Sequence, residues 1–214
     1  MAEYNSDEER LTAIMDFLKR NLRIILLTFG AVFFTAITSF SVSSYYANQN
    51  AQAADLYDTW FSAALEESIN LEEKASTFTT LQENFSKTGY AGLARLIKGS
   101  QLAREGNLEA SLQEFNELLD ATTGLFGNDI LNVIARINIA RIELSNDNFS
   151  SVLEVLEPLN SSSEHPMVYE IKADALLGLN KNELALAQYN LAITNMNDES
   201  QKSLLKIKIN KITQ

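Results

Sequence analysis

The sequence contains no cysteine and a single histidine, His165, and these absences remove several classes of chemistry. Without thiols the chain forms no disulfide, no thiolate zinc site and no iron–sulfur cluster, and it has no cysteine nucleophile. With one histidine, a serine triad has a single candidate base and a multi-histidine metal site has no ligand set. We therefore expect no metal and no other cofactor.

Proline and glycine are also scarce, at 2 and 8 of 214 residues, which favours long helices. Basic residues are outnumbered, because 17 Lys and Arg face 28 Asp and Glu and leave a net charge of −11. A chain of this charge lacks the basic face that phosphates require. The composition thus argues against nucleic acid as a main partner.

What the sequence does contain is one long run without charge, from residue 24 to residue 54. Its most apolar part ends at Val42. A hydrocarbon core of about 30 Å needs roughly 20 helical residues, so the run is long enough to cross a bilayer. Tyr45 and Tyr46 lie at its far end, where aromatic rings suit the interface. We predict a transmembrane helix over residues 24–46.

Basic residues set the predicted orientation. Four precede the span, and no Lys or Arg follows until Lys74. The positive-inside rule then places a leader, residues 1–23, in the cytoplasm and residues 47–214 outside. The outer part carries 13 basic and 23 acidic residues, net −10, so anionic headgroups should repel it. A cleaved signal peptide, with Ala51-Gln52-Ala53 as its site, is the alternative; the run exceeds a typical signal core, which favours the uncleaved anchor.

The outer part shows helical periodicity and no convincing strand pattern. The segments after residue 89 that fit a helix are 90–105, 107–121, 129–145, 148–157, 166–179, 182–196 and 199–212. Three of them align on Ser111, Val152 and Ala185. A small residue stands twelve positions before each of these, a large apolar residue stands four positions after it, and Leu118, Leu159 and Ala192 stand seven positions after it. This register resembles the tetratricopeptide repeat.

The match to that repeat is degenerate. Arg95 and Arg136 stand where the repeat favours a tryptophan-like residue, although Tyr169 fits, so an irregular helical bundle with chance matches is the alternative. We predict an all-α protein: one N-terminal transmembrane helix, then a tetratricopeptide-like α-solenoid of antiparallel helix pairs, with residues 199–212 as a C-terminal capping helix.

The whole layout resembles a family, the YfgM-like ancillary subunits of the bacterial Sec translocon. The resemblance lies in the order of weak motifs: the acidic leader Asp7-Glu8-Glu9, the amphipathic stretch 11–22, the single span, a helix beginning near Ala53, Tyr90-Ala91-Gly92-Leu93-Ala94, Gly106-Asn107-Leu108-Glu109 and Lys208-Ile209-Asn210. It implies an inner-membrane protein with a periplasmic repeat domain. It also implies association with the SecYEG channel and a membrane-anchored chaperone of the prolyl isomerase type, and help to newly exported, unfolded proteins.

No constellation of residues in the sequence suggests catalysis, so we expect a non-enzymatic binding module. In tetratricopeptide arrays the first helix of each pair lines a groove. The same register here selects Leu93, Leu96, Ser100 and Arg104; Ile134, Ile137, Arg141 and Ser145; and Met167, Glu170 and Asp174. Apolar groove residues suit a peptide-like partner. The alternative is that the leucines and isoleucines are core; Arg104 and Arg141 are the better candidates for exposed contacts.

The leader offers a second hypothesis. Leu11, Ile14, Met15 and Leu18 fall at helical spacing next to basic residues, which suits a cytoplasmic membrane interface or the docking of a cytosolic regulator. In that case the protein would be a membrane tether for a stress-response regulator, sensing the envelope through its repeat domain. A plain extension of the transmembrane helix is the simpler interpretation of the same residues.

Overall fold

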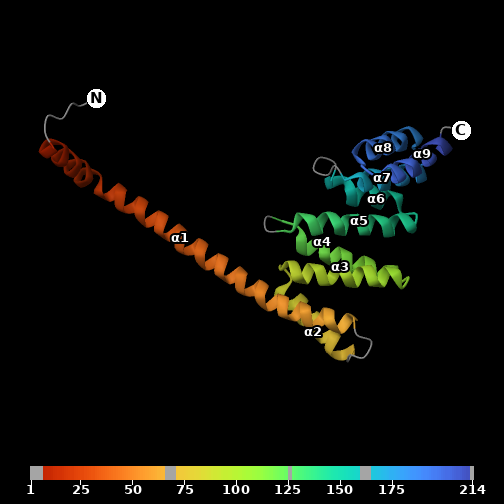
Figure 1. Cartoon of the computed structure of the whole chain (residues 1–214), viewed down its shortest axis with the longest axis horizontal. Helices are drawn as coiled ribbons and strands as arrows, with labels where there is room; N and C mark the ends of the chain where they lie inside the picture. The colour runs from red at the N-terminus through yellow and green to blue at the C-terminus, as the bar shows by residue number, and fades with distance from the viewer. Residues whose placement is uncertain (1–6, 66–70, 125–126, 160–164, 213–214) are drawn as a thin grey trace. The chain divides into compact units, whose positions relative to one another are not determined.

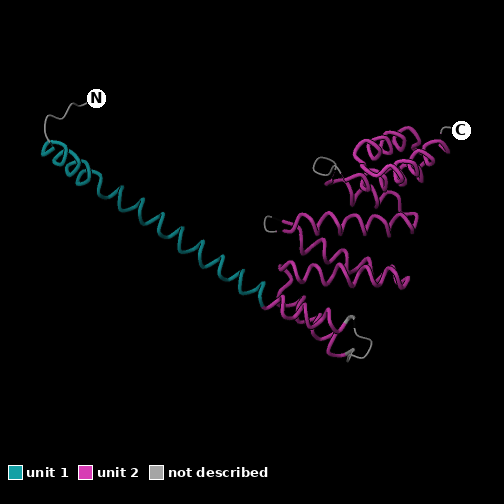
Figure 2. The backbone as a smooth tube through the Cα atoms, in the orientation of Figure 1, with its two compact units in different colours: residues 1–51 teal, residues 52–214 magenta. Residues whose placement is uncertain are grey.

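The computed structural model describes residues 7–65, 71–124, 127–159 and 165–212, and within these ranges every regular element is helical (Figure 1). The chain divides into two compact units, residues 1–51 and 52–214 (Figure 2). The helices are α1 (Asp7–Leu65), α2 (Leu71–Phe85), α3 (Gly89–Arg104), α4 (Leu108–Thr122), α5 (Asp129–Ser145), α6 (Phe149–Leu156), α7 (Pro166–Gly178), α8 (Asn182–Asn195) and α9 (Glu199–Ile212), with a 3-10 turn (Glu157–Leu159) after α6. The predicted break at Ser161–Ser163 lies outside the described residues.

The first unit is the N-terminal part of α1, and by length and composition this helix is a candidate to cross a membrane. Its large side chains are exposed, with Phe29, Phe33 and Phe40 at 72%, 69% and 77%. Its polar side chains are satisfied within the helix: the hydroxyls of Thr28 and Thr35 donate to carbonyls one turn earlier, at 2.9 and 2.8 Å. An apolar surface with internally bonded polar groups is what a lipid environment requires.

The second unit consists of antiparallel helix pairs that follow one another along the chain: α3 with α4, α5 with α6 and α7 with α8, with α9 against the last pair (Figure 1). Each predicted segment from residue 90 onward corresponds to a helix whose ends agree within one residue. A further pair precedes these three. It is formed by the end of α1 and by α2, where Trp60 packs on Phe78 with ring centroids 5.7 Å apart.

The predicted repeat register is the register of the core. The twelve aligned residues are all buried: Gly99, Ala140 and Ala173; Ser111, Val152 and Ala185; Phe115, Leu156 and Tyr189; Leu118, Leu159 and Ala192. The small residues lie where two helices touch. At Gly99 an added Cβ would lie 2.9 Å from the Phe115 ring, and the Ser111 hydroxyl donates to the Gly99 carbonyl at 2.7 Å. Close packing therefore explains why these positions exclude larger residues.

The turn inside each pair is also repeated. Gly106, Asp147 and Asn180 occupy the same place in the register and have φ of 80°, 58° and 59°. The next residue in each turn donates its N–H to a carbonyl five residues earlier, at 2.9 Å in all three pairs. This is the hydrogen bond of a Schellman helix ending, in which one residue takes the left-handed conformation. The repeats are thus equivalent in backbone as well as in core.

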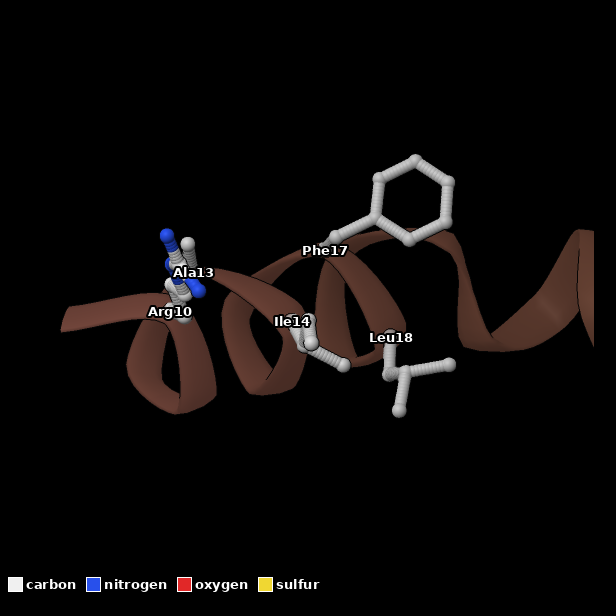
Figure 3. A pocket seen from close by; sticks show the side chains of 5 residues that line it. All are labelled: Arg10, Ala13, Ile14, Phe17 and Leu18. Atoms are coloured by element: carbon white, nitrogen blue, oxygen red, sulfur yellow. The ribbon is translucent and has the colours of Figure 1, made fainter. Parts of the chain in front are cut away.

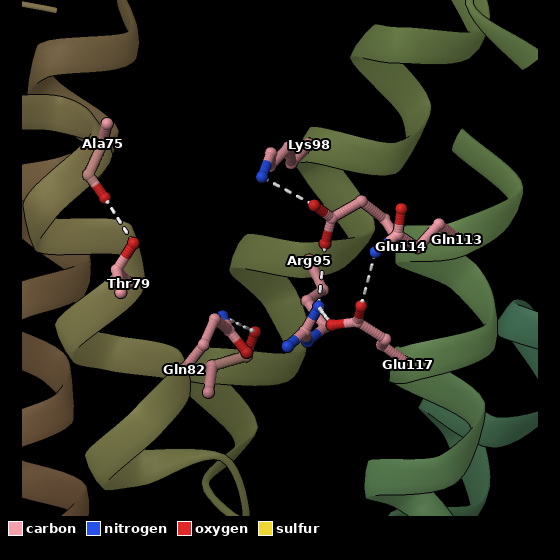
Figure 4. A network of polar contacts seen from close by, with 9 residues as sticks. Ala75, Thr79, Gln82, Arg95, Lys98, Gln113, Glu114 and Glu117 are labelled. Atoms are coloured by element: carbon pink, nitrogen blue, oxygen red, sulfur yellow. Dashed lines mark hydrogen bonds and ion pairs between the residues drawn. The ribbon is translucent and has the colours of Figure 1, made fainter. Parts of the chain in front are cut away.

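The two arginines that depart from the repeat pattern share one structural role. Arg95 reaches from α3 to Glu114 on α4, with 2.9 Å between Nη1 and Oε2, and it also pairs with Glu117 (Figure 4). Arg136 reaches from α5 to the carbonyl of Val155 on α6, at 2.8 Å. Both therefore bridge the two helices of their own pair, the contact that a large aromatic ring makes by packing.

Candidate functional site

The strongest candidate site is a groove of about 490 Å³ between α3 and α5. The α3 side supplies Leu96, Ile97, Ser100, Ala103 and Arg104, the α5 side supplies Asn138, Arg141, Ile142 and Ser145, and Leu108 and Phe115 of α4 complete it. Both α3 and α5 are the first helices of their pairs in chain order, since α3 pairs with α4 and α5 with α6. We call this surface the α3–α5 groove.

The groove has an apolar base and a polar rim. Phe115 is 1% exposed and belongs to the core, so the base is rigid. The hydroxyls of Ser100 and Ser145 donate to carbonyls of their own helices, each at 2.7 Å, and the side-chain amide of Asn138 donates to Ile134 at 2.9 Å. The two serine hydroxyls are therefore used internally as donors, Asn138 keeps one N–H, and the oxygens of all three side chains remain as acceptors.

Arg104 and Arg141 are exposed on the rim, as the sequence predicts. Within the described part of the chain, neither guanidinium makes a hydrogen bond or an ion pair. This differs from Arg95 and Arg136, whose guanidiniums are bound to neighbouring helices. The rim thus presents two cationic groups with donors to spare.

A family profile described as tetratricopeptide repeat-like domain matches residues 15–214. The chain belongs to this family. The matched region takes in the whole uncharged segment, residues 24–54, together with the helix pairs of the repeat-like domain. No curated protein and no solved structure matches the chain. The all-α tetratricopeptide repeat-like fold is typical of non-catalytic protein-interaction domains, and it implies protein partners in general.

The repeat-like domain brings together only part of the predicted groove. Leu96, Ser100, Arg104, Arg141 and Ser145 line the α3–α5 groove. Leu93 and Met167, each 39% exposed, and the half-buried Ile134 lie outside it. The α3–α5 groove therefore extends from Leu96 to Arg104 on α3 and from Asn138 to Ser145 on α5.

Ile137 is core, which corrects its assignment to the groove surface. It is 7% exposed and packs in a cluster with Val152, Leu156 and Val168. The physical reason is the central place of α5, which contacts α3, α4, α6 and α7 and so has apolar neighbours on most sides.

Glu170 and Asp174 do not line the α3–α5 groove. They lie at the face between α7 and α9, where both pair with Lys208 and where Asp174, Tyr189 and Lys208 line a separate hollow of about 460 Å³. The Lys208 ammonium lies 2.9 Å from the Glu170 carboxylate and 2.9 Å from both oxygens of Asp174. The Tyr189 hydroxyl donates to Asp174 as well. Burial, and then the Asp174 carboxylate, raise the pKa of Tyr189. Burial lowers the pKa of Lys208, but its bonds to Asp174 and Glu170 outweigh this and raise it.

Sequence reasoning missed Asn138 and the contribution of α4. Asn138 lies one turn before Arg141 on the same face of α5, and this spacing was the available signal. Leu108 and Phe115 lie on α4, the second helix of its pair. Their sequence spacing gives no sign that they reach a groove between α3 and α5.

The leader carries a second hollow, lined by Arg10, Ala13, Ile14, Phe17 and Leu18 (Figure 3). Phe17 and Ile14 are each 57% exposed and Leu11 is 64% exposed. This apolar face lies on a single helix and is lined by one cation, Arg10. Metal chemistry has no support in the described ranges, where no group of three His, Asp or Glu residues is placed to hold an ion.

Proposed function

We propose that this protein is a membrane-anchored protein-binding module whose α3–α5 groove holds segments of its partners. The observation that carries the proposal is the groove itself: an apolar base and a cationic rim on the first helices of two successive pairs. A concave surface of this kind binds a polypeptide through buried apolar side chains and orients it through a few polar contacts.

The anchoring part of the proposal rests on the apolar helix. One family profile covers the repeat-like domain and the whole uncharged segment, so the two belong to one pattern. The four basic residues before that segment, with no Lys or Arg after it until Lys74, support a cytoplasmic N-terminus and an outer repeat domain.

The specific role that we propose is that of an ancillary subunit of the Sec translocon in the bacterial inner membrane. In this role the span would contact the SecYEG channel, and the periplasmic groove would contact a membrane-anchored chaperone or newly exported, unfolded chains. The support is the resemblance of the leader, the span and the repeat motifs to the YfgM-like subunits, together with a groove suited to unfolded segments.

Photo-crosslinking in living cells tests this role. Probes go at Phe33 in the apolar segment and at Ser145 on the groove rim, with Asn116, exposed on α4 and outside the groove, as the matched control. We expect Phe33 to crosslink to the channel and Ser145 to a chaperone or an exported chain, with no such product from Asn116. Equal yields at Ser145 and Asn116 would remove the groove from the proposal, and no channel product at Phe33 would separate the protein from secretion.

The leader hollow favours a second function, a tether for a cytosolic regulator. Its exposed apolar face at Leu11, Ile14 and Phe17 would receive that partner. Deleting residues 2–18 distinguishes the two functions. If the deletion abolishes the stress response but leaves chaperone association intact, the result supports the tether. A deletion without any effect contradicts the tether.

A further inference from the structure

The charges around the α3–α5 groove define what kind of segment it accepts. The domain that holds the groove carries a net charge of −10, so its acidic residues outnumber its basic ones by ten. Arg95, Lys98 and Lys208 are each paired with an acidic residue, with carboxylates 2.6 to 2.9 Å from their nitrogens. Arg104 and Arg141 line one groove, one on each wall, and neither has such a partner among the described residues.

Guanidinium groups recognise carboxylates through paired N–H donors, and such contacts are about twice as strong as neutral hydrogen bonds. The other polar groups of the groove complement them. The Asn138 side-chain oxygen and the two serine oxygens remain as acceptors, which suits the backbone N–H groups of an extended chain. Leu96, Leu108 and Phe115 offer an apolar base for an aliphatic side chain.

Resting on the proposed function, we infer that the α3–α5 groove selects extended polypeptide segments in which acidic side chains alternate with aliphatic ones, and that Arg104 and Arg141 bind the carboxylates. The acid is an internal side chain rather than a chain terminus. A clamp for a terminal carboxylate needs several donors that converge on one group, but both serine hydroxyls and one of the two Asn138 side-chain N–H groups already donate within their own helices. An anionic lipid surface is disfavoured because the surrounding domain is acidic.

Fluorescence anisotropy with defined peptides tests the inference on the full-length protein in phosphatidylcholine nanodiscs. The main probe is a ten-residue peptide with an amidated C-terminus, in which leucine alternates with glutamate between serine and glycine ends, labelled with a zwitterionic rhodamine. A second peptide has glutamine in place of every glutamate. A third is the glutamine peptide with a free C-terminal carboxylate.

We expect the glutamate peptide to bind about tenfold more tightly than the glutamine peptide, and the difference to shrink as salt rises. The double variant R104Q/R141Q should reduce binding of the glutamate peptide to the level of the glutamine peptide. The charge-matched variant K181Q/K206Q, which changes exposed lysines outside the groove, should leave it unchanged. All variants should keep the wild-type circular dichroism spectrum, since both arginines are exposed.

Several results would overturn the inference. Equal binding of the glutamate and glutamine peptides, both blocked by S145W at the rim, would leave a groove that binds chains without reading charge, and the proposed function would survive. Binding that S145W does not change would remove the groove itself. Tight binding of the free-acid glutamine peptide would assign the arginines to a chain terminus. Arginine-dependent binding to phosphatidylglycerol vesicles would assign them to lipid.

Discussion

The α3–α5 groove and the face between α7 and α9 occupy corresponding places in the repeat, and they differ in charge and in how that charge is paired. Arg141 on α5 and Asp174 on α7 share one register position. Arg141 stands on the rim of an open groove, whereas Asp174 is bound by Lys208 of α9 and by the Tyr189 hydroxyl. The two faces thus differ in how their charges are used: the Arg141 guanidinium has no partner among the described residues, whereas the Asp174 carboxylate is paired with α9.

The basic character of α9 complements the acidic positions of the helix pair on which it packs. It carries Lys202, Lys206, Lys208 and Lys211 against one acid, Glu199. An acidic face on α7 attracts such a helix, whereas a face with two arginines would repel it. Complementary charge between Lys208 and the two α7 carboxylates therefore adds to the apolar contact of Leu205 with the last pair.

The largest expected effect concerns the aromatic residue behind each face. Phe115 and Tyr189 share a register position and are 1% and 0% exposed. Replacing either by alanine should lower the free energy of unfolding by about 3–5 kcal/mol, because each change leaves a large cavity. Urea denaturation followed by circular dichroism measures this. Phe115→Leu, a smaller change, should cost under about 2 kcal/mol.

If Phe115→Ala lowered the free energy of unfolding much less than Tyr189→Ala, the base of the α3–α5 groove would not be packed core. The comparison between the two faces would then fail. If both cost the same, only Phe115→Ala should also weaken binding of the glutamate peptide, since Phe115 lines the open groove and Tyr189 does not.

A smaller loss of stability is expected at the ion pairs between α7 and α9. Lys208→Met removes the bonds to Glu170 and Asp174, and because the Lys208 side chain is 40% exposed, solvent screening limits the loss to about 1 kcal/mol. Lys202→Met is the matched control, because Lys202 pairs only along its own helix with Glu199, at 2.8 Å. That variant should lose less than about 0.5 kcal/mol. Equal losses in the two variants would mean that charge does not hold α9.

The contact of Lys208 with Glu170 and Asp174 should make the stability of the protein depend on pH in a characteristic way. The folded-state pKa of Lys208 is raised, so the folded protein holds this proton more tightly than the unfolded chain does. Its stabilising contribution is therefore complete below the ordinary lysine pKa of about 10.4 and is lost as the pH rises through the raised value. The difference in melting temperature between wild type and Lys208→Met should be constant from pH 7 to about 10 and should shrink above it. A difference that grows above pH 10 would contradict this assignment.

The repeat register was predictable because it rests on local packing rules. Gly99, Ala140 and Ala173 must be small where helices touch, and such residues at fixed spacing are visible in one sequence. The exposure of Arg104 and Arg141 was predictable too, since a guanidinium is rarely buried without a partner.

The rest depended on contacts between distant residues. Ile137 and Leu96 share a register position, and only the neighbours of α5 decide that one is core and the other lines the groove. The pairing of Glu170 with Lys208 joins residues 38 apart and depends on where α9 packs. Periodicity along a single helix does not contain that information.

The smallest expected effect tests whether the turns beside the two faces are equivalent. Asp147 follows α5 and Asn180 follows α7, and both hold the left-handed conformation that Gly106 holds at the corresponding turn. Asp147→Gly relieves a backbone strain but also gives the unfolded chain more freedom, so a net gain of about 0.5 kcal/mol is expected, and Asn180→Gly should gain less because asparagine tolerates this conformation well. Gly106→Ala should instead lose about 1 kcal/mol. Melting temperatures measure all three, and a loss in Asp147→Gly beside a gain in Asn180→Gly would mean that the two faces differ in backbone as well as in charge.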